Sequence, residues 1–334
     1  MSNGRRVWLR SAVGVGLGAA CLWAVAARVD PDELAASFSR LRPGWLVVAV
    51  FISLGIQLLR AWRWKVELSV LAELDYWTTW KVVSVSYMMI NVLPFRLGEP
   101  VRPLLMAWKS GLRVPAIVGN WVFEKMMDAA AMVFFVHLAL LSADLPDWAG
   151  AASRGSLALF GLMVALVAGY WLGGDQLIDS ALGRLLPTNA SRKVSAALSS
   201  AREGLSVLPN TGLVALVALL TLALWSLPVL SSWVLILAFD FDLPFAAALA
   251  VFVAIGAGTA LPNPPGMVGV FQVATVVALG LFGVPLADAV AYGLLLNAIQ
   301  LITLVAQGLV ALSLLGPGAG EATRRALSEN AESS

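Results

Sequence analysis

Long apolar segments decide what this chain can fold into. Six stretches are predominantly apolar, and a helix of about 20 apolar residues is long enough to cross the hydrocarbon core of a bilayer. They cover residues 8–28, 44–62, 116–142, 153–173, 211–239 and 289–315. Because 60% of the 334 residues are hydrophobic and only 13% are charged, we expect an all-α polytopic membrane protein.

Two further apolar regions, residues 80–109 and 245–284, are each interrupted near the middle. The interruptions read LPFRLGEPVRP and LPNPPGMVG. Proline and glycine end helices, because proline lacks a backbone donor and glycine is conformationally free. Inside a bilayer, the freed backbone groups must be satisfied within the protein or in a water-filled cavity. Each region is therefore expected to form two short helices rather than one span.

The distribution of lysine and arginine predicts the orientation, because basic residues are enriched on the cytoplasmic side. A cytoplasmic N-terminus keeps most of the basic clusters inside, and we expect a bacterial cytoplasmic (inner) membrane protein with both termini in the cytoplasm. The cytoplasmic basic residues are then Arg60, Arg63, Lys65, Arg184, Arg192, Lys193, Arg202, Arg324 and Arg325.

Six full spans with this orientation require each broken region to enter and leave on one face of the membrane. The first then enters from the cytoplasm and the second from outside, as two re-entrant hairpins in an inverted-repeat arrangement. The alternative is that the breaks are ordinary kinked spans or cytoplasmic loops.

We expect one transmembrane domain over residues 1–316. Residues 175–210 are expected to form a cytoplasmic amphipathic linker between its halves, and residues 317–334 a disordered cytoplasmic tail. The segment DPDELAASFSRL, which begins at Asp30, has a capping residue followed by proline. It predicts a short helix on the outer interface.

The first charged motif lies in the first broken region and contains Arg96, Glu99, Arg102 and Lys109. A charge at membrane depth costs about 3 kcal/mol on insertion scales, so such side chains face a cavity or one another. Glu99 and Arg102 are three positions apart on a possible half-helix, close enough to pair. If they pair, Arg96 is left for a phosphate or carboxylate. The alternative is a cytoplasmic loop whose basic residues follow the positive-inside rule.

A second motif, the charge cluster Glu124, Lys125 and Asp128, falls within one apolar span. This spacing places all three charges on one side of a helix. The two carboxylates could carry protons, or they could tie this helix to Arg96 and Arg102 through ion pairs.

The third motif, LPNPPGMVGVFQ, is the uncharged break of the second region. Its polar capacity comes from two amide side chains and from backbone groups freed by proline and glycine. The candidate residues are Pro262, Asn263, Pro265, Gly266, Gly269 and Gln272. Free N–H groups at the start of a half-helix attract anions. The alternative is a kink that permits close packing.

Several functional classes are excluded by what the sequence lacks. Cys21 and His137 are the only cysteine and histidine, which leaves no material for zinc clusters or for Ser-His and Cys-His relays. A net charge of +2 is too small to indicate nucleic acid. No P-loop is present, and no metal or cofactor is expected.

Taken in order, the three motifs resemble a known family. Asn91, Pro94, Arg96, Gly98, Glu99 and Arg102, then Glu124 and Asp128, then Pro262, Pro265, Gly266 and Gly269, are similar to the blocks of the lysylphosphatidylglycerol synthase transmembrane region, or flippase-like domain. Two positions depart from the pattern: Lys125 stands where the family commonly has arginine, and Gln272 where it commonly has glutamate.

The resemblance implies lipid movement between leaflets by this domain. No soluble synthase domain follows the last span, so lysyl transfer by this polypeptide is not expected. The leading hypothesis is a lipid transporter that binds and translocates an anionic phospholipid or polyprenyl-phosphate lipid. Its headgroup would be bound by Asn91, Arg96, Glu99 and Arg102.

Two alternatives remain open. One is a membrane enzyme that acts on lipid-linked phosphates or sugars through Glu99, Glu124 and Asp128. The other is an accessory subunit of a cell-envelope lipid pathway, whose partners would be proteins of that pathway. All three hypotheses place anionic membrane lipids among the partners.

Overall fold

The computed structural model describes residues 29–93, 98–142, 150, 153–165, 168–169, 199–200, 202–259 and 264–316. Throughout these residues the chain is helical or irregular and has no strand, as expected. The elements in chain order are α2 (Pro31–Ser39), α3 (Pro43–Leu68), α4 (Tyr76–Val92), α5 (Val101–Ser110), α6 (Val114–Ser142), the unlabelled helix Ser153–Ala165, α9 (Thr211–Ala238), α10 (Phe245–Thr259), the 3-10 turn η2 (Pro265–Met267), α11 (Val270–Gly280) and α12 (Leu286–Leu315).

Four helices are long and apolar enough to cross a membrane: α3, α6, α9 and α12. They contain 26 to 30 residues each, which corresponds to about 39 to 45 Å and exceeds the bilayer core. They match four of the six expected spans. The expected span 8–28 lies outside the described residues, and the one at 153–173 is described as the shorter apolar helix Ser153–Ala165. The described chain is therefore a multi-pass helical membrane protein.

The helix expected after Asp30 is α2. The Asp30 carboxylate accepts a hydrogen bond from the backbone N–H of Asp32 at 2.9 Å, and a proline stands in the first turn. On the side facing the bundle, Leu34 packs against the buried core and Phe38 lies beside Phe239, with ring centroids 6.4 Å apart. The cap and the apolar stripe thus determine both where this helix begins and which face it buries.

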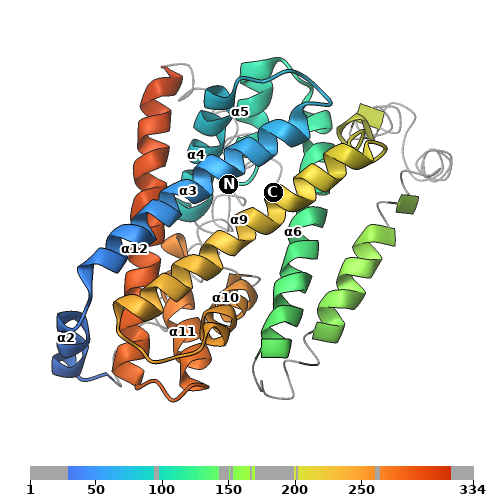
Figure 1. The fold of residues 1–334 in the computed structure, drawn as a ribbon. Helices are drawn as coiled ribbons and strands as arrows, with labels where there is room; N and C mark the ends of the chain where they lie inside the picture. Colours follow the sequence, from blue (N-terminus) through green and yellow to red (C-terminus); the bar gives the residue numbers. More distant parts are fainter. Residues whose placement is uncertain are drawn as a thin grey trace, which may run out of the picture.

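The described bundle repeats one order of elements twice. A long helix is followed by a hairpin of two short helices and then by a second long helix: α3, α4 with α5, α6, and later α9, α10 with α11, α12. The two hairpins enter the bundle from opposite ends (Figure 1). With 10 to 17 residues, the helices of the two hairpins reach only about 15 to 26 Å. Each broken region therefore forms two short helices, as its proline and glycine break predicts.

The two halves are interlocked. The first long helices, α3 and α9, pack along each other (Figure 1), whereas α4 packs against α12 and α10 against α6. At one end of the bundle, Lys109 Nζ of α5 donates to the Leu315 carbonyl of α12 at 3.3 Å. At the other end, the Arg42 backbone N–H, just before α3, donates to the Ala238 carbonyl at the end of α9 at 2.9 Å. The packing of α4 on α12 and of α10 on α6 holds each hairpin against the last helix of the opposite half.

Both breaks fall where the sequence predicts them. Helix α4 ends at Leu93 in extended geometry, and α5 resumes after the turn at 98–100. In the second break, Gly266 and Gly269 have φ angles of 67° and 93°, and Met267 has a φ of 55°. Left-handed backbone of this kind favours glycine. The expected site residues Arg96, Pro262 and Asn263 lie outside the described residues.

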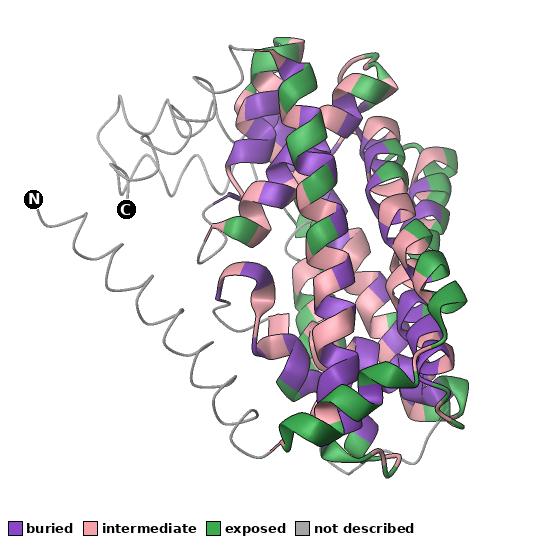
Figure 2. Cartoon of the chain, turned by 90° about the vertical axis from the view of Figure 1, so that its left-hand side faces the viewer, coloured by how far each residue is buried: buried purple, intermediate pink, exposed green. Residues whose placement is uncertain are grey.

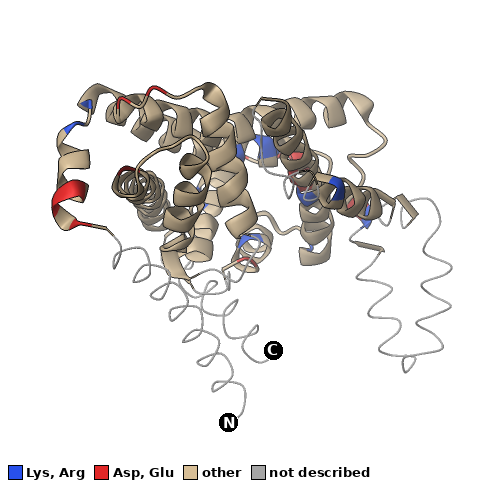
Figure 3. Ribbon diagram, turned by 90° about the horizontal axis from the view of Figure 1, so that it is seen from below, with Lys and Arg blue, Asp and Glu red and all other residues tan. Residues whose placement is uncertain are grey.

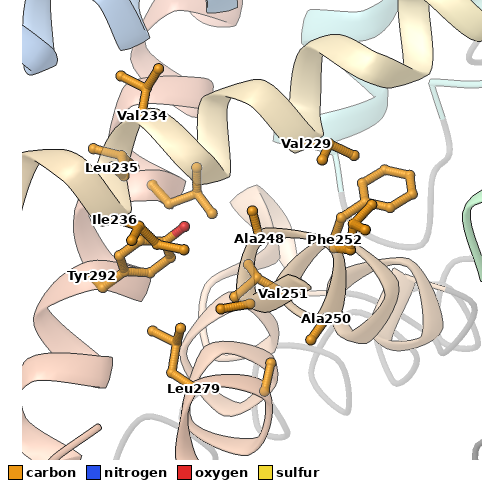
Figure 4. Close-up of a cluster of buried hydrophobic side chains, with 14 of the residues drawn as sticks. Val229, Val234, Leu235, Ile236, Ala248, Ala250, Val251, Phe252, Leu279 and Tyr292 are labelled. Atoms are coloured by element: carbon orange, nitrogen blue, oxygen red, sulfur yellow. The ribbon is translucent and has the colours of Figure 1, made fainter. Parts of the chain in front are cut away.

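The buried apolar side chains form separate clusters at the two ends of the bundle. The larger one joins α9, α10, α11 and α12, and Figure 4 shows Leu235 and Ile236 of α9 close to Tyr292 of α12. The Tyr292 hydroxyl donates to the Ser232 carbonyl at 2.6 Å, which satisfies this polar group inside an apolar region. The second cluster joins α3, α4, α5 and the end of α12. Outward-facing positions remain exposed along the long helices (Figure 2), where lipid would cover them.

Candidate functional site

A buried network of charged side chains lies where α3, α5 and α6 meet. Most of the described ribbon carries no charge (Figure 3), so this concentration is unusual. Glu124 of α6 is bound by two arginines: Arg102 Nη1 and Nη2 lie 2.8 and 2.7 Å from its two oxygens, and Arg63 Nη2 lies 3.0 Å from Oε1. These three side chains are at most 3% exposed. Glu124 therefore joins the first hairpin to two long helices.

Arg102 pairs with a residue of another helix. The sequence spacing allows an ion pair between Glu99 and Arg102 on a half-helix, but the structure gives Arg102 the carboxylate of Glu124. Glu99 lies in the turn before α5 rather than within the helix, so it is not on the same helical face as Arg102. The alternative reading, in which the carboxylates of α6 tie it to a basic residue of the first hairpin, describes this contact.

Two members of the network, Arg63 and Glu67, were not identified from the sequence. Arg63 was assigned to the cytoplasmic side because the apolar stretch ends at residue 62, but α3 continues to Leu68 and buries both side chains. Arg63 Nε lies 3.3 Å from Glu67 Oε1, one helical turn further on. This i,i+4 pair of opposite charges was the signal available in the sequence.

An aromatic ring next to Arg63 also contacts the network. Trp64 is 1% exposed, and the Arg102 guanidinium lies 3.9 Å from its ring centroid. The ring therefore supports a buried cation rather than marking the membrane surface.

Asp128 extends the network to α9. It accepts from Arg63 Nη1 at 2.5 Å and from Trp225 Nε1 of α9 at 2.9 Å, and Lys125 Nζ lies 3.8 Å away. Arg63 also donates to Thr221 Oγ1 of α9 at 3.2 Å. Desolvating ions costs several kcal/mol each, so these mutual contacts are needed for the charges to stay buried.

A cavity adjoins this network. This charged compartment has a volume of about 150 Å³. Most of its lining side chains are charged, aromatic or amide: Arg60, Arg63, Tyr87, Ile90, Asn91, Glu99, Arg102, Trp121, Lys125, Asp128, Leu224, Trp225 and Met267. The structure thus brings Asn91, Glu99, Arg102, Lys125 and Asp128 to one cavity, beside the buried Glu124. Lys109 lies away from it and bonds to the Leu315 carbonyl, and Arg96 lies outside the described residues.

A second compartment of about 240 Å³ borders the first and is mainly apolar. Its apolar walls come from α3, α6, α10, α11 and α12, and include Ile56, Met132, Phe252 and Leu304. The two compartments share the lining residues Arg60, Tyr87, Asn91, Trp225 and Met267. A charged space therefore continues into an apolar one within the same bundle.

The tip of the second hairpin closes one side of this cavity. Gln272 Oε1 accepts from the Gly269 N–H at 2.6 Å, and Asn297 Nδ2 of α12 donates to the Gly266 carbonyl at 2.9 Å. One of the N–H groups that was a candidate for anion binding is therefore occupied by the chain itself. A small space of about 50 Å³ is lined by Gly266, Asn297 and Asn91 of the first hairpin, so the described residues beside the two breaks lie close together.

Among the described residues, no three Asp, Glu, His or Cys side chains are arranged to hold a metal ion. Glu67, Glu124 and Asp128 approach one another only through Arg63, which occupies the place between them.

Comparison with known proteins gives one clear result. A family model described as the lysylphosphatidylglycerol synthase TM region matches residues 10–308, which is most of the chain. No curated protein matches it.

Proposed function

The chain belongs to the lysylphosphatidylglycerol synthase TM region family, and from this we propose that it binds a lipid with an anionic headgroup in the two-compartment cavity and moves it between leaflets. Membership of a membrane-domain family related to lipid handling supports the substrate class. The proposal goes further in assigning translocation to this chain.

The observation that carries the proposal is the juxtaposition of the two compartments. A membrane lipid joins a charged headgroup to apolar chains, and it needs a site with the same division. The charged compartment offers arginine and lysine side chains, whereas the neighbouring one offers aliphatic and aromatic walls. Most binding sites for small molecules are apolar with a few placed polar groups, and this cavity follows that pattern.

The two hairpins supply a means of movement. Their tips meet beside the cavity, near Asn91 and Gly266, and each hairpin enters from a different end. If both are re-entrant in the membrane, separating one from the neighbouring long helices would open the cavity to one leaflet. Alternation between the two openings is the mechanism of many transporters built from inverted repeats.

Within this proposal the residues of the first hairpin divide into two roles. Asn91 and Glu99 line the charged compartment and remain proposed headgroup contacts, together with Arg96 between them in sequence. Arg102 lines it too, but its guanidinium is held by Glu124. It is therefore proposed to position the hairpin against α6 more than to bind lipid.

Reconstitution into phosphatidylcholine vesicles tests the proposal. Movement of fluorescent phosphatidylglycerol and phosphatidylcholine would be compared for the wild type, Arg96→Ala and Glu99→Gln. We expect the wild type to move the anionic lipid faster than the zwitterionic one, and both variants to lose that advantage. Arg113→Gln is the control, because Arg113 pairs with Glu203 on an exposed surface away from the cavity. Equal rates for all proteins and for empty vesicles would refute translocation.

A further inference from the structure

The arginine and lysine side chains that line the charged compartment differ in how closely carboxylates of the protein are paired with them. We propose that Arg60, held over the ring of Tyr87, is the residue that binds the phosphate of the lipid headgroup. This inference rests on the proposed function of the same cavity and assigns its anion-binding group.

The partners of the other cations exclude them from this role. Among the described residues, four cations line the charged compartment: Arg60, Arg63, Arg102 and Lys125. Arg63 lies within ion-pair distance of three carboxylates and Arg102 is paired through both Nη atoms with Glu124. A phosphate would have to displace these carboxylates before it could bind to Arg63 or Arg102. Lys125 has Asp128 at 3.8 Å and does not line the apolar compartment, so it is not placed between the headgroup and the chains of a lipid.

Arg60 is different because its visible partners are neutral. Its Nη1 donates to Gln57 Oε1 at 2.5 Å, and its guanidinium carbon lies 3.8 Å from the centroid of the Tyr87 ring. Within the part of the chain that the structure describes, no carboxylate oxygen comes within 4.0 Å of its nitrogens. Since arginine has five N–H donors, one bond to Gln57 leaves others for a ligand.

The ring of Tyr87 also orients the guanidinium. A cation over an aromatic face is stabilised without losing its charge, and the edge of the planar group stays available for a two-pronged contact with phosphate. Arg60 comes from α3 and Tyr87 from α4. The contact therefore couples the anion-binding group to the first hairpin.

The position of Arg60 matches the place where a lipid phosphate would sit. Of the described cations, Arg60 is the one that lines both compartments. In a phospholipid, the phosphate lies between the headgroup substituent and the apolar chains. A phosphate bound at Arg60 would direct the chains into the apolar compartment and the rest of the headgroup toward Asn91 and Glu99.

Binding to purified protein in phosphatidylcholine nanodiscs tests this assignment. The probes are fluorescent phosphatidylglycerol and fluorescent diacylglycerol, which differ by the phosphoglycerol headgroup. We expect Arg60→Gln to weaken binding of phosphatidylglycerol about tenfold or more, because a hydrogen bond to a charged group is being removed. Binding of diacylglycerol should not change.

Two further variants separate charge from shape. Arg60→Lys keeps the charge but not the planar fork, so its affinity should fall between those of the wild type and Arg60→Gln. Tyr87→Phe keeps the ring and should bind as the wild type does, whereas Tyr87→Leu should bind more weakly. The control is again Arg113→Gln. These variants also keep the test decisive if Arg60→Gln does not fold.

The outcomes distinguish this inference from the proposed function. If the wild type prefers phosphatidylglycerol but Arg60→Gln and Arg60→Lys keep that preference, Arg60 is not the anion-binding group and the cavity remains a lipid site. If the wild type binds neither lipid, the proposed function itself fails. Inorganic phosphate and glycerol phosphate are added as competitors. If either binds as tightly as the lipid, the site is for a soluble phosphate compound, which would also overturn the inference.

Discussion

Arg63 of α3 and Glu124 of α6 lie 61 positions apart in the sequence and form an ion pair with an N–O distance of 3.0 Å, in which both side chains are at most 1% exposed. Glu124 also holds Arg102. One carboxylate thus contacts two buried arginines and links side chains of three helices, while Arg63 is also paired with Glu67 and Asp128.

Replacing this carboxylate should strongly destabilise the protein. Glu124→Gln leaves the guanidinium of Arg102 without its described carboxylate, and removing one partner of a buried ion pair costs about 3 to 5 kcal/mol. We expect a clearly lower Tm in detergent, measured by tryptophan fluorescence. In the exposed pair of Arg113 and Glu203, Glu203→Gln should change stability by about 1 kcal/mol or less. Similar Tm values for both variants would show that the buried network does not stabilise the fold.

Gly98 allows the first hairpin to fold back on α4. A Cβ atom at this position would lie 2.4 Å from both the Ile90 nitrogen and the Met89 carbonyl carbon, which are backbone atoms that cannot move aside locally. We expect Gly98→Ala to displace the hairpin and to reduce lipid transport in vesicles while the protein still inserts. Gly55→Ala is the matched control, since Gly55 has open space around its Cβ position. Full transport by Gly98→Ala would mean that this close approach is not needed.

Asn297 should restrain the tip of the second hairpin. Its side chain donates to the Gly266 carbonyl from α12, and leaving this buried acceptor unpaired costs about 1 to 3 kcal/mol. Asn297→Ala should therefore speed amide hydrogen exchange in residues 264–272, measured by mass spectrometry. Gln307→Ala is a control on the same helix, because Gln307 donates to the carbonyl of Thr303 within α12. If hydrogen exchange in residues 264–272 is unchanged in Asn297→Ala, contacts other than the Asn297 hydrogen bond restrain this segment.

Orientation in the membrane can be tested with single cysteines in a Cys21→Ser background. Ser39 lies at the end of α2 and Glu203 beside the start of α6, at opposite ends of the bundle (Figure 1). A cytoplasmic N-terminus predicts that an impermeant maleimide labels Ser39→Cys in intact spheroplasts. Glu203→Cys should react only after the membrane is permeabilised. The reverse pattern would invert the orientation that the basic residues predict.

Much of the fold could be predicted because it depends on local chemistry. The cap at Asp30 and the proline and glycine breaks near Leu93 and Gly266 each act within a few residues of their own position. Apolar length predicts α3, α6, α9 and α12 for the same reason. How the two halves interlock depends on which helix faces meet, and periodicity alone does not specify a partner.

The site was predicted less completely. Its acidic residues were found because charges such as Glu124 and Asp128 stand out in an apolar span. Arg63 was missed because a basic residue at the end of an apolar run also fits the positive-inside rule. Whether Arg63 is a surface residue or part of a buried ion pair depends on the approach of α6 to α3. That contact joins residues 61 positions apart and is not visible in the local sequence.

The packing of each hairpin against the last helix of the other half has a consequence for biosynthesis. About 190 residues separate the end of α4 from the start of α12, its partner. At about 5 to 20 residues per second, the ribosome needs about 10 to 40 s to synthesise them. During that time α4 is already made while the surface that covers it does not yet exist. The newly inserted N-terminal half must then be sheltered by the insertion machinery or by lipid until translation is nearly complete.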